Sequence, residues 1–254
     1  MTPNSILFYI FVFIYGIVIG SFLNVCIYRI PKKESIVVVN SHCMNCNHKL
    51  AWYDLFPLFS FLFLKGKCRY CGNRLSLQYP VVELLNGILY IVIFAVNGMN
   101  LESTLYALMT SALLTLSVID YRTMEIPIGI NAVILGIGVI HLFCDLENWI
   151  HYLIGFFAAS LFLFLCLIAT RGKGIGGGDI KLMAAAGLCL GWQNILLALA
   201  AGCIIGSIIQ CVIIAVTKNK TKFAMGPYLS VGIFVSMLWG NVFVDWYIGL
   251  GAML

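Results

Sequence analysis

Two pairs of cysteines are the first residues whose types and spacing indicate chemistry. Cys43 and Cys46 form one CxxC motif, Cys68 and Cys71 form a second, and 21 residues separate them. Two such motifs can converge on one tetrahedral zinc ion through four thiolates, and a site closed in this way is structural because no coordination position stays open. The alternatives are unpaired thiols, a disulfide formed on oxidation, or replacement of one thiolate by a histidine that flanks the first motif.

Two aspartates at the ends of long apolar segments are the second candidate site. Asp120 closes one segment and Asp179 opens another. Carboxylates at a membrane edge are costly and often functional, although each could simply pair with the nearby cation, Arg122 or Lys181. Two carboxyl groups in close contact share one proton, so that one acts as a base toward water and the other as an acid toward a leaving group. The pair is therefore a candidate aspartic protease centre.

Three glycines precede the second aspartate. Gly176, Gly177 and Gly178 have no Cβ, so extended or left-handed backbone is accessible and another chain can approach closely. A phosphate-binding loop is excluded because the chain has no GxxxxGK[ST] pattern. The glycines predict a backbone loop that holds a peptide substrate in extended form.

The composition places these candidates in a membrane. The 254 residues are 62% hydrophobic and 10% charged, with a mean hydropathy of +1.01, which excludes a soluble domain. The net charge of +5 is explained by the positions of the basic residues, described next, and not by nucleic-acid binding. The chain is predicted to be an all-α polytopic membrane protein.

Apolar segments long enough to cross a bilayer need roughly 20 residues. The segments are 5–28, 80–97, 103–120, 127–144, 149–170, 180–192, 194–216 and 226–248. The sixth is short and is separated from the seventh by a turn at 191–194, so seven crossings are an alternative to eight. The prediction is about eight transmembrane helices, with a small zinc-binding cytoplasmic loop domain between the first two.

The basic residues alternate along the chain. All fifteen fall in every second loop: Arg29, Lys32, Lys33, Lys49, Lys65, Lys67, Arg69 and Arg74, then Arg122, then Arg171, Lys173 and Lys181, then Lys218, Lys220 and Lys222. Cytoplasmic loops retain Lys and Arg, so this pattern favours eight crossings. It predicts a multi-pass protein of the cytoplasmic (inner) membrane with both termini outside and the two aspartates at the cytoplasmic face.

The segments define three parts of the chain. Residues 1–28 are a first transmembrane helix, uncleaved because its basic residues follow the apolar run instead of preceding it. Residues 29–79 are the cytoplasmic zinc-binding loop domain, which is too small to bury a sufficient core without metal. Residues 80–254 are a transmembrane domain that contains both aspartates.

These motifs together resemble the bacterial type IV prepilin peptidases, which belong to the GxGD group of intramembrane aspartic proteases. The GxGD motif is 176–179 here. The other matching stretches are 20–31, the two CxxC motifs, 79–85, 120–127, 178–183 and 226–229. Their order and spacing cover nearly all of the chain.

The resemblance implies two activities. The enzyme would cleave the leader from prepilins or pseudopilins at the cytoplasmic membrane face, with Asp120 and Asp179 as catalytic residues in a peptidase domain. It would then methylate the new N-terminus with S-adenosylmethionine, using the zinc-binding loop domain, in which Gly66 and Lys67 match positions linked to methyl transfer. Ile128 and Gly177 depart from the family pattern and could alter how the substrate is seated.

Other functions remain open at this point. The aspartates could relay protons in a proton-coupled transporter, although both lie at one face and no repeat is visible. A non-catalytic membrane assembly protein with a zinc loop is a further alternative. The expected partners are the pilin-like substrates and the lipid bilayer, with no nucleic acid, and nothing in the sequence indicates an oligomeric state.

Overall fold

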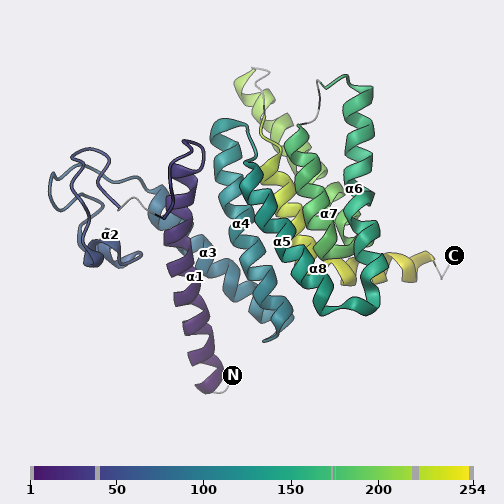
Figure 1. Ribbon diagram of the computed structural model, residues 1–254, viewed down its shortest axis with the longest axis horizontal. Coiled ribbons are helices and arrows are strands. Elements are labelled where there is room, and N and C mark those ends of the chain that lie inside the picture. The colour runs from purple at the N-terminus through teal and green to yellow at the C-terminus, as the bar shows by residue number, and fades with distance from the viewer. Residues whose placement is uncertain (1–2, 38–40, 173, 175, 219–222, 252–254) are drawn as a thin grey trace. The chain divides into compact units, whose positions relative to one another are not determined.

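Long apolar segments form helices because no water in a bilayer can satisfy free backbone groups. The computed structural model, which describes residues 3–37, 41–172, 174, 176–218 and 223–251, has helices and no strand in these ranges (Figure 1). Six of its helices are long and apolar enough to span a membrane. The chain divides into two compact units, Met1–Met99 and Asn100–Leu254, each described by itself here.

In the first unit, two long helices pack against each other through small residues. They are α1, Pro3–Arg29, and α3, Gln78–Asn97. A Cβ added at Gly16 would lie 2.8 Å from the Gly87 Cα, and one at Gly20 would lie 2.7 Å from the Glu83 Cα. Glycine therefore lets the two backbones approach, as is typical of membrane helices.

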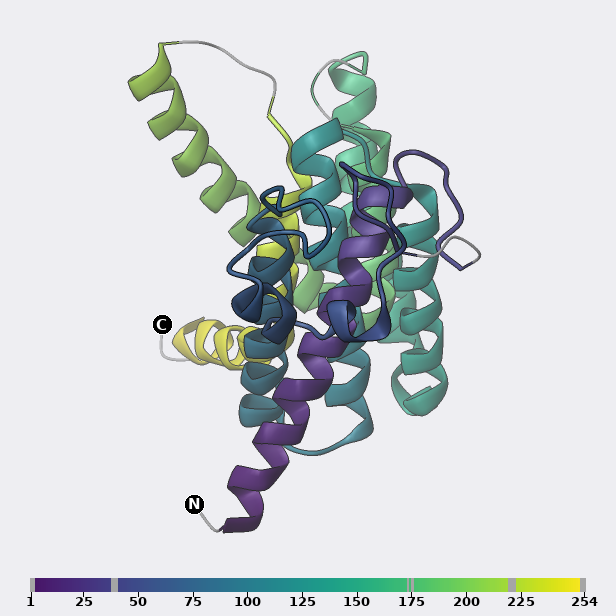
Figure 2. The same cartoon turned by 90° about the vertical axis from the view of Figure 1, so that its left-hand side faces the viewer.

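The segment between these helices contains little regular structure. It has a 3-10 turn η1, Trp52–Leu55, a short helix α2, Phe59–Phe63, and two isolated bridges, His42 to Lys49 and Lys67 to Arg74. No residue of η1 or α2 is buried. The segment lies beside the Arg29 end of α1 (Figure 2). Its order cannot depend on a hydrophobic core of its own.

The second unit is a helical bundle. Its elements are α4, Leu101–Thr123; α5, Ile128–Cys144; η2, Leu146–Asn148; α6, Trp149–Ala169; α7, Gly177–Thr217; and α8, Gly226–Gly251. α7 packs against α5, α6 and α8, and α4 packs against α5 and α8. α4 is the most buried of the six candidate spans, which explains how it carries several polar side chains.

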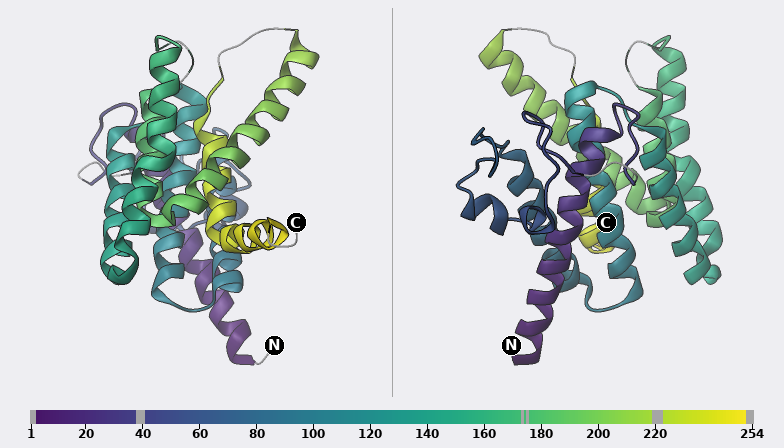
Figure 3. Two further views of the ribbon diagram at one scale, coloured as in Figure 1. Left: turned by 90° about the vertical axis from the view of Figure 1, so that its right-hand side faces the viewer. Right: turned by 60° about the vertical axis from the view of Figure 1, so that its left-hand side comes forward.

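A kink divides α7 into two arms. Gly191 has φ 77° and ψ 172°, a conformation available to glycine alone. The arms form a V (Figure 3), so the chain reverses within this element. The break predicted at 191–194 is thus confirmed at Gly191, whereas residues 192–194 are helical. The six long helices, the shorter α5 and the second arm of α7 account for the eight predicted segments.

The alternating helix directions bring particular ends together in the second unit. The end of α4, the start of α7, the end of its second arm and the start of α8 lie at one end of the bundle (Figure 1). The basic residues at this end are Arg122, Arg171, Lys181 and Lys218, while Lys173, Lys220 and Lys222 lie outside the described residues. The start of α4 and the α5–α6 connection are at the opposite end.

Candidate active site and metal centre

Asp120 lies in the last turn of α4 and is held by the first residue of α8. α4 ends because Met124 adopts a left-handed conformation and donates its N–H to the Asp120 carbonyl at 2.8 Å. The Asp120 Oδ2 accepts a hydrogen bond of 2.9 Å from the Gly226 N–H, and the residue is 4% exposed. A Cβ at Gly226 would lie 2.6 Å from Oδ2, so glycine is required for this contact.

Asp179 is the third residue of α7. It is 8% exposed, and its Oδ1 is buried without a hydrogen-bond partner. Such an atom is costly unless a substrate or water uses it. Lys181 is exposed and no ion pair joins it to Asp179 in the described part of the chain, so the simple pairing of these two residues is not formed.

The glycines before Asp179 differ from the predicted loop. The predicted segment began at residue 180, whereas α7 begins at Gly177, so Gly177 and Gly178 are helical. Gly176 caps the helix with extended backbone, φ −78° and ψ 139°, and none of the three uses a left-handed conformation. Their small size has a different use, because a Cβ at Gly178 would lie 2.8 Å from the Ile126 Cβ.

The connection between α4 and α5 brings the two acids to one end of the unit. Ile126 packs on Gly178, and the Asn131 side chain donates to the Gly178 carbonyl at 3.4 Å. Asp120 and Asp179 are close enough to interact electrostatically. Gly226 lay within a stretch singled out in the sequence, but its contact with Asp120 was not predicted, and neither was the role of Asn131.

The four cysteines of the loop segment lie together in the first unit. Their Sγ atoms are all within 4.8 Å of one another, and Cys43 and Cys71 are 3.9 Å apart. Sulfur atoms on a tetrahedral zinc ion are about 3.8 Å apart for a zinc–sulfur bond of about 2.3 Å. The donor set and spacing therefore fit zinc, and the flanking histidines are not part of the group.

Tight turns shape both cysteine motifs. In the first motif, the Cys43 carbonyl accepts a hydrogen bond of 2.8 Å from the Asn47 N–H. In the second, the Cys68 carbonyl accepts one of 2.9 Å from the Gly72 N–H. Asn47 and Gly72 both have positive φ. Burial raises the pKa of the Cys43 thiol, but hydrogen bonds from backbone N–H groups and neighbouring thiols outweigh this effect and lower the pKa to about 6. The thiolate is the form that binds metal.

An ion pair fastens the second motif to η1. The Arg69 Nε lies 2.7 Å from the Asp54 Oδ1, and the Tyr70 hydroxyl donates to Oδ2 at 3.1 Å. Burial raises the pKa of Asp54, but these hydrogen bonds outweigh it and hold the pKa below its usual value. Arg69 is half exposed, so the pair contributes little stability and mainly fixes geometry.

Gly66 and Lys67 lie immediately before the second motif. Gly66 has φ +69° and accepts a hydrogen bond of 2.8 Å from the Leu75 N–H, which closes a hairpin-like turn. Lys67 is exposed and forms the isolated bridge with Arg74. The structure thus gives Gly66 a conformational role and leaves the Lys67 amine at the surface.

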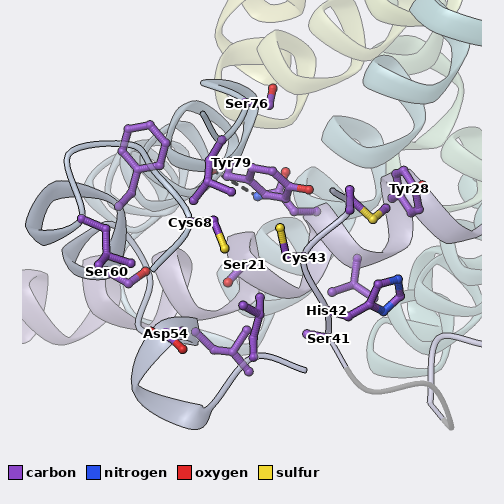
Figure 4. A pocket seen from close by; sticks show the side chains of 18 of the residues that line it. Ser21, Tyr28, Ser41, His42, Cys43, Asp54, Ser60, Cys68, Ser76 and Tyr79 are labelled. Carbon is purple, nitrogen blue, oxygen red and sulfur yellow. Dashed lines mark hydrogen bonds between the residues drawn. The ribbon is translucent and has the colours of Figure 1, made fainter. Parts of the chain in front are cut away.

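The first unit also contains a cavity of about 320 Å³ (Figure 4). Residues of α1, the start of α3 and both cysteine motifs line it, among them Ser21, Arg29, Tyr79 and Glu83. Glu83 lay within the stretch 79–85 singled out in the sequence, but no sequence pattern predicted the cavity.

Fold and sites define a polytopic helical membrane protein with a loop whose four cysteines could hold a metal ion. Residues 107–211 match the type IV leader peptidase family, and residues 14–96 match the bacterial peptidase A24 N-terminal domain. The chain belongs to the type IV leader peptidase family.

Individual relatives match along almost their whole length. A prepilin leader peptidase/N-methyltransferase of Bacillus subtilis (strain 168) is 34% identical over 93% of this chain and 96% of its own. Proteins with the same description from Aeromonas salmonicida (strain A449) and a Pseudomonas aeruginosa strain are 30% and 26% identical, over 95% and 98% of this chain and 94% and 96% of theirs. No solved structure matches the chain.

Proposed function

We propose that this enzyme cleaves the leader peptide from prepilins or pseudopilins and then methylates the new N-terminal amine. Membership of the leader peptidase family and the printed names of the relatives support both steps. The single observation that carries the cleavage step is the burial of Asp120 and Asp179 at one end of one bundle.

Cleavage is proposed to use the two carboxyl groups as an acid and a base. The ionised carboxylate accepts a proton from water while the water oxygen bonds to the scissile carbonyl carbon. The protonated carboxyl then donates its proton to the amide nitrogen as the carbon–nitrogen bond breaks. The buried, unpartnered Asp179 Oδ1 supports this proposal, since it leaves an acceptor available to the water. The Gly176 backbone, which is extended just before α7, would bind the substrate in extended form.

The loop segment is proposed to bind zinc and to serve methyl transfer. Cys43, Cys46, Cys68 and Cys71 would hold the ion, which ties the two motifs together where the segment has no core. S-adenosylmethionine would supply the methyl group, and Gly66 and Lys67 belong to the region proposed to act on it. Residues 80–254 would form the peptidase domain and residues 29–79 the loop domain.

The orientation is proposed from charge. Basic residues gather at the acid-bearing end of the second unit and in the loop segment, so both would face the cytoplasm, with the two termini outside the inner membrane. Pilin-like substrates in the same bilayer would then meet the acids at the cytoplasmic membrane face.

The test is cleavage of a purified prepilin by the full-length protein in nanodiscs. Asp120→Asn and Asp179→Asn keep side-chain size but remove the acid–base function, so each should lower the cleavage rate by at least about 100-fold. The double variant should be little slower than either single variant, because the two groups act as a unit. Asp245→Asn is the matched control, since Asp245 is exposed near the far end of α8.

Two results would contradict the proposal. Near-normal cleavage by Asp120→Asn would show that the two acids do not act together. Failure of the wild-type protein to cleave any prepilin would instead favour the proton-coupled transporter or the non-catalytic assembly protein.

A further inference from the structure

The cavity of the first unit lies against the inner side of the cysteine motifs. Cys43 and Cys68, the two buried cysteines of the four, line it, whereas Cys46 and Cys71 are exposed and do not. Figure 4 shows the Cys43 and Cys68 side chains beside Ser21 of α1 and Tyr79 of α3. One wall of the cavity is therefore also the wall of the metal centre.

We propose that this cavity is the S-adenosylmethionine site of the enzyme. The inference rests on the proposed methylation and adds the place where the methyl donor binds and the residues that would recognise it. The volume of the cavity, about 320 Å³, falls within the usual range of small-molecule sites, roughly 300–1,000 Å³.

The cavity wall carries charges of both signs, as the donor does. S-adenosylmethionine carries a sulfonium and an ammonium group, both cationic, and one carboxylate. Five charged side chains line the wall, Arg29, Asp54, Arg69, Arg74 and Glu83, and of these Arg29 and Glu83 are almost fully buried, each 6% exposed. Glu83 can attract the cationic groups of the donor, and Arg29, whose guanidinium donates to the Ser35 carbonyl at 3.1 Å, adds a positive charge to the same wall for the donor carboxylate.

Glu83 is held in place by the loop that closes the cavity. Its Oε2 accepts a hydrogen bond of 2.8 Å from the Leu58 N–H, and Leu58 has an unusual positive φ of 57°. A non-glycine residue with this conformation is strained unless its surroundings hold it. The contact fixes the carboxylate and couples the shape of the loop to α3. Glu83 would then stabilise the sulfonium cation by charge.

The wall also contains apolar and aromatic side chains beside its polar ones. Tyr28, Phe61, Leu75 and Tyr79 all line the cavity. Ligand sites that bind a flat heterocycle typically combine such surfaces with a few polar groups. The adenine ring of the donor supplies the matching surface, which a simple polyamine or a free phosphate would not.

The transfer itself needs no metal chemistry. The free amine nitrogen of the cleaved substrate forms a bond to the methyl carbon as the carbon–sulfur bond breaks and its electron pair stays on sulfur. The nitrogen then releases one proton to water. Zinc, held by all four cysteines, would affect the cavity through the two that line it, Cys43 and Cys68, by keeping that wall in place.

The experiment measures binding of S-adenosylmethionine and of its neutral product S-adenosylhomocysteine to the zinc-loaded, full-length protein by calorimetry. Leu75→Trp fills the cavity and should weaken the binding of both ligands by at least about 100-fold, because each ligand needs the same space. Leu62→Trp is the matched control, since Leu62 is 71% exposed and does not line the cavity, and it should bind normally.

A second variant tests the charge. The glutamine of Glu83→Gln can still accept the hydrogen bond from Leu58 but has no negative charge. The variant should therefore bind S-adenosylmethionine about 10-fold more weakly and S-adenosylhomocysteine with nearly unchanged affinity. Zinc content and thermal unfolding of each variant establish that the loop is folded.

The outcomes separate this proposal from the proposed function. Normal donor binding by a folded Leu75→Trp, or equal loss of both ligands in Glu83→Gln, overturns the assignment of the cavity while methylation stands. A wild-type protein that cleaves prepilin but binds no donor overturns both this site and the methylation step. A wild-type protein that binds the donor but does not cleave prepilin would contradict only the acid pair.

Discussion

At the scale of single residues, the acids depend on neighbours that have no side chain of their own. Gly226 donates its N–H to Asp120, and Gly178 allows Ile126 to pack against the residue before Asp179. Asn131 adds a hydrogen bond to the Gly178 carbonyl. The candidate site is thus positioned by contacts that involve the backbone of α7 and α8 and join them to α4 and α5.

Gly226→Ala should reduce cleavage by at least about 10-fold. Alanine keeps the N–H but adds a Cβ 2.6 Å from the Asp120 Oδ2, which forces the carboxylate to move. A misplaced catalytic group can lower a rate by up to about 100-fold. Methylation of a pre-cleaved pilin should be unchanged. Gly249→Ala is the control, because its Cβ would meet nothing within 4 Å, and equal loss in both variants would contradict the positioning role.

The pH dependence of cleavage is a second consequence at this scale. If the two acids share one proton in the active form, the rate should fall both at low pH, where both are protonated, and at high pH, where both are ionised. The two apparent pKa values would belong to the pair. A cleavage rate that changes with only one ionisation across the stable pH range would contradict a shared proton.

At the scale of helices, close backbone contacts replace the hydrophobic effect that lipid cannot provide. Gly16 and Gly87 join α1 to α3, and Gly155 and Gly187 bring α6 and α7 into backbone contact. Such contacts gain van der Waals energy only where no side chain intervenes. Glycine is also required at the Gly191 kink, for a different reason: the His151 ring occupies the space that a Cβ would need.

Gly191→Ala should destabilise the second unit by about 1–3 kcal/mol or more. The backbone at this position is nearly restricted to glycine, and the added methyl group would also collide with His151. Thermal unfolding in detergent measures the effect. Gly136→Ala in α5 is the matched control, because its Cβ would have open space. Similar unfolding temperatures for both variants would show that the kink is not held as described.

At the scale of the whole molecule, the two proposed chemistries lie in different compact units. The cysteines and the cavity belong to Met1–Met99, and both acids belong to Asn100–Leu254. The group of side chains that could hold a metal ion consists of the four cysteines of the first unit and includes neither acid. Cleavage and methylation should therefore respond separately to loss of metal.

Zinc removal should abolish methylation before it affects cleavage. The purified protein should contain one zinc ion per chain, and Cys43→Ser or Cys68→Ser should lower that content because each removes one of four ligands. Elemental analysis gives the stoichiometry, and mass spectrometry of the processed pilin gives both activities. Absence of stoichiometric zinc, or immediate loss of cleavage with the metal, would contradict the separation.

Labelling of cysteines in intact cells tests the orientation. Cys144 is exposed at the end of the second unit opposite the acids and should react with an impermeant maleimide from outside. Cys46 and Cys71 are exposed in the loop segment and should react only after permeabilisation and removal of metal. External labelling of Cys46 would reverse the proposed topology.

The amino-acid sequence by itself determined the class of protein, the order of its crossings and the residue types of its sites. Apolar length, alternating Lys and Arg, and CxxC spacing are local patterns, so they predicted the helices, the break at 191–194 and the convergence of four cysteines. Only the tertiary structure decided that Gly226 holds Asp120, that two of the three glycines are helical, and that Arg29 and Glu83 line one cavity. These features join residues far apart in the chain, and no local pattern records such contacts.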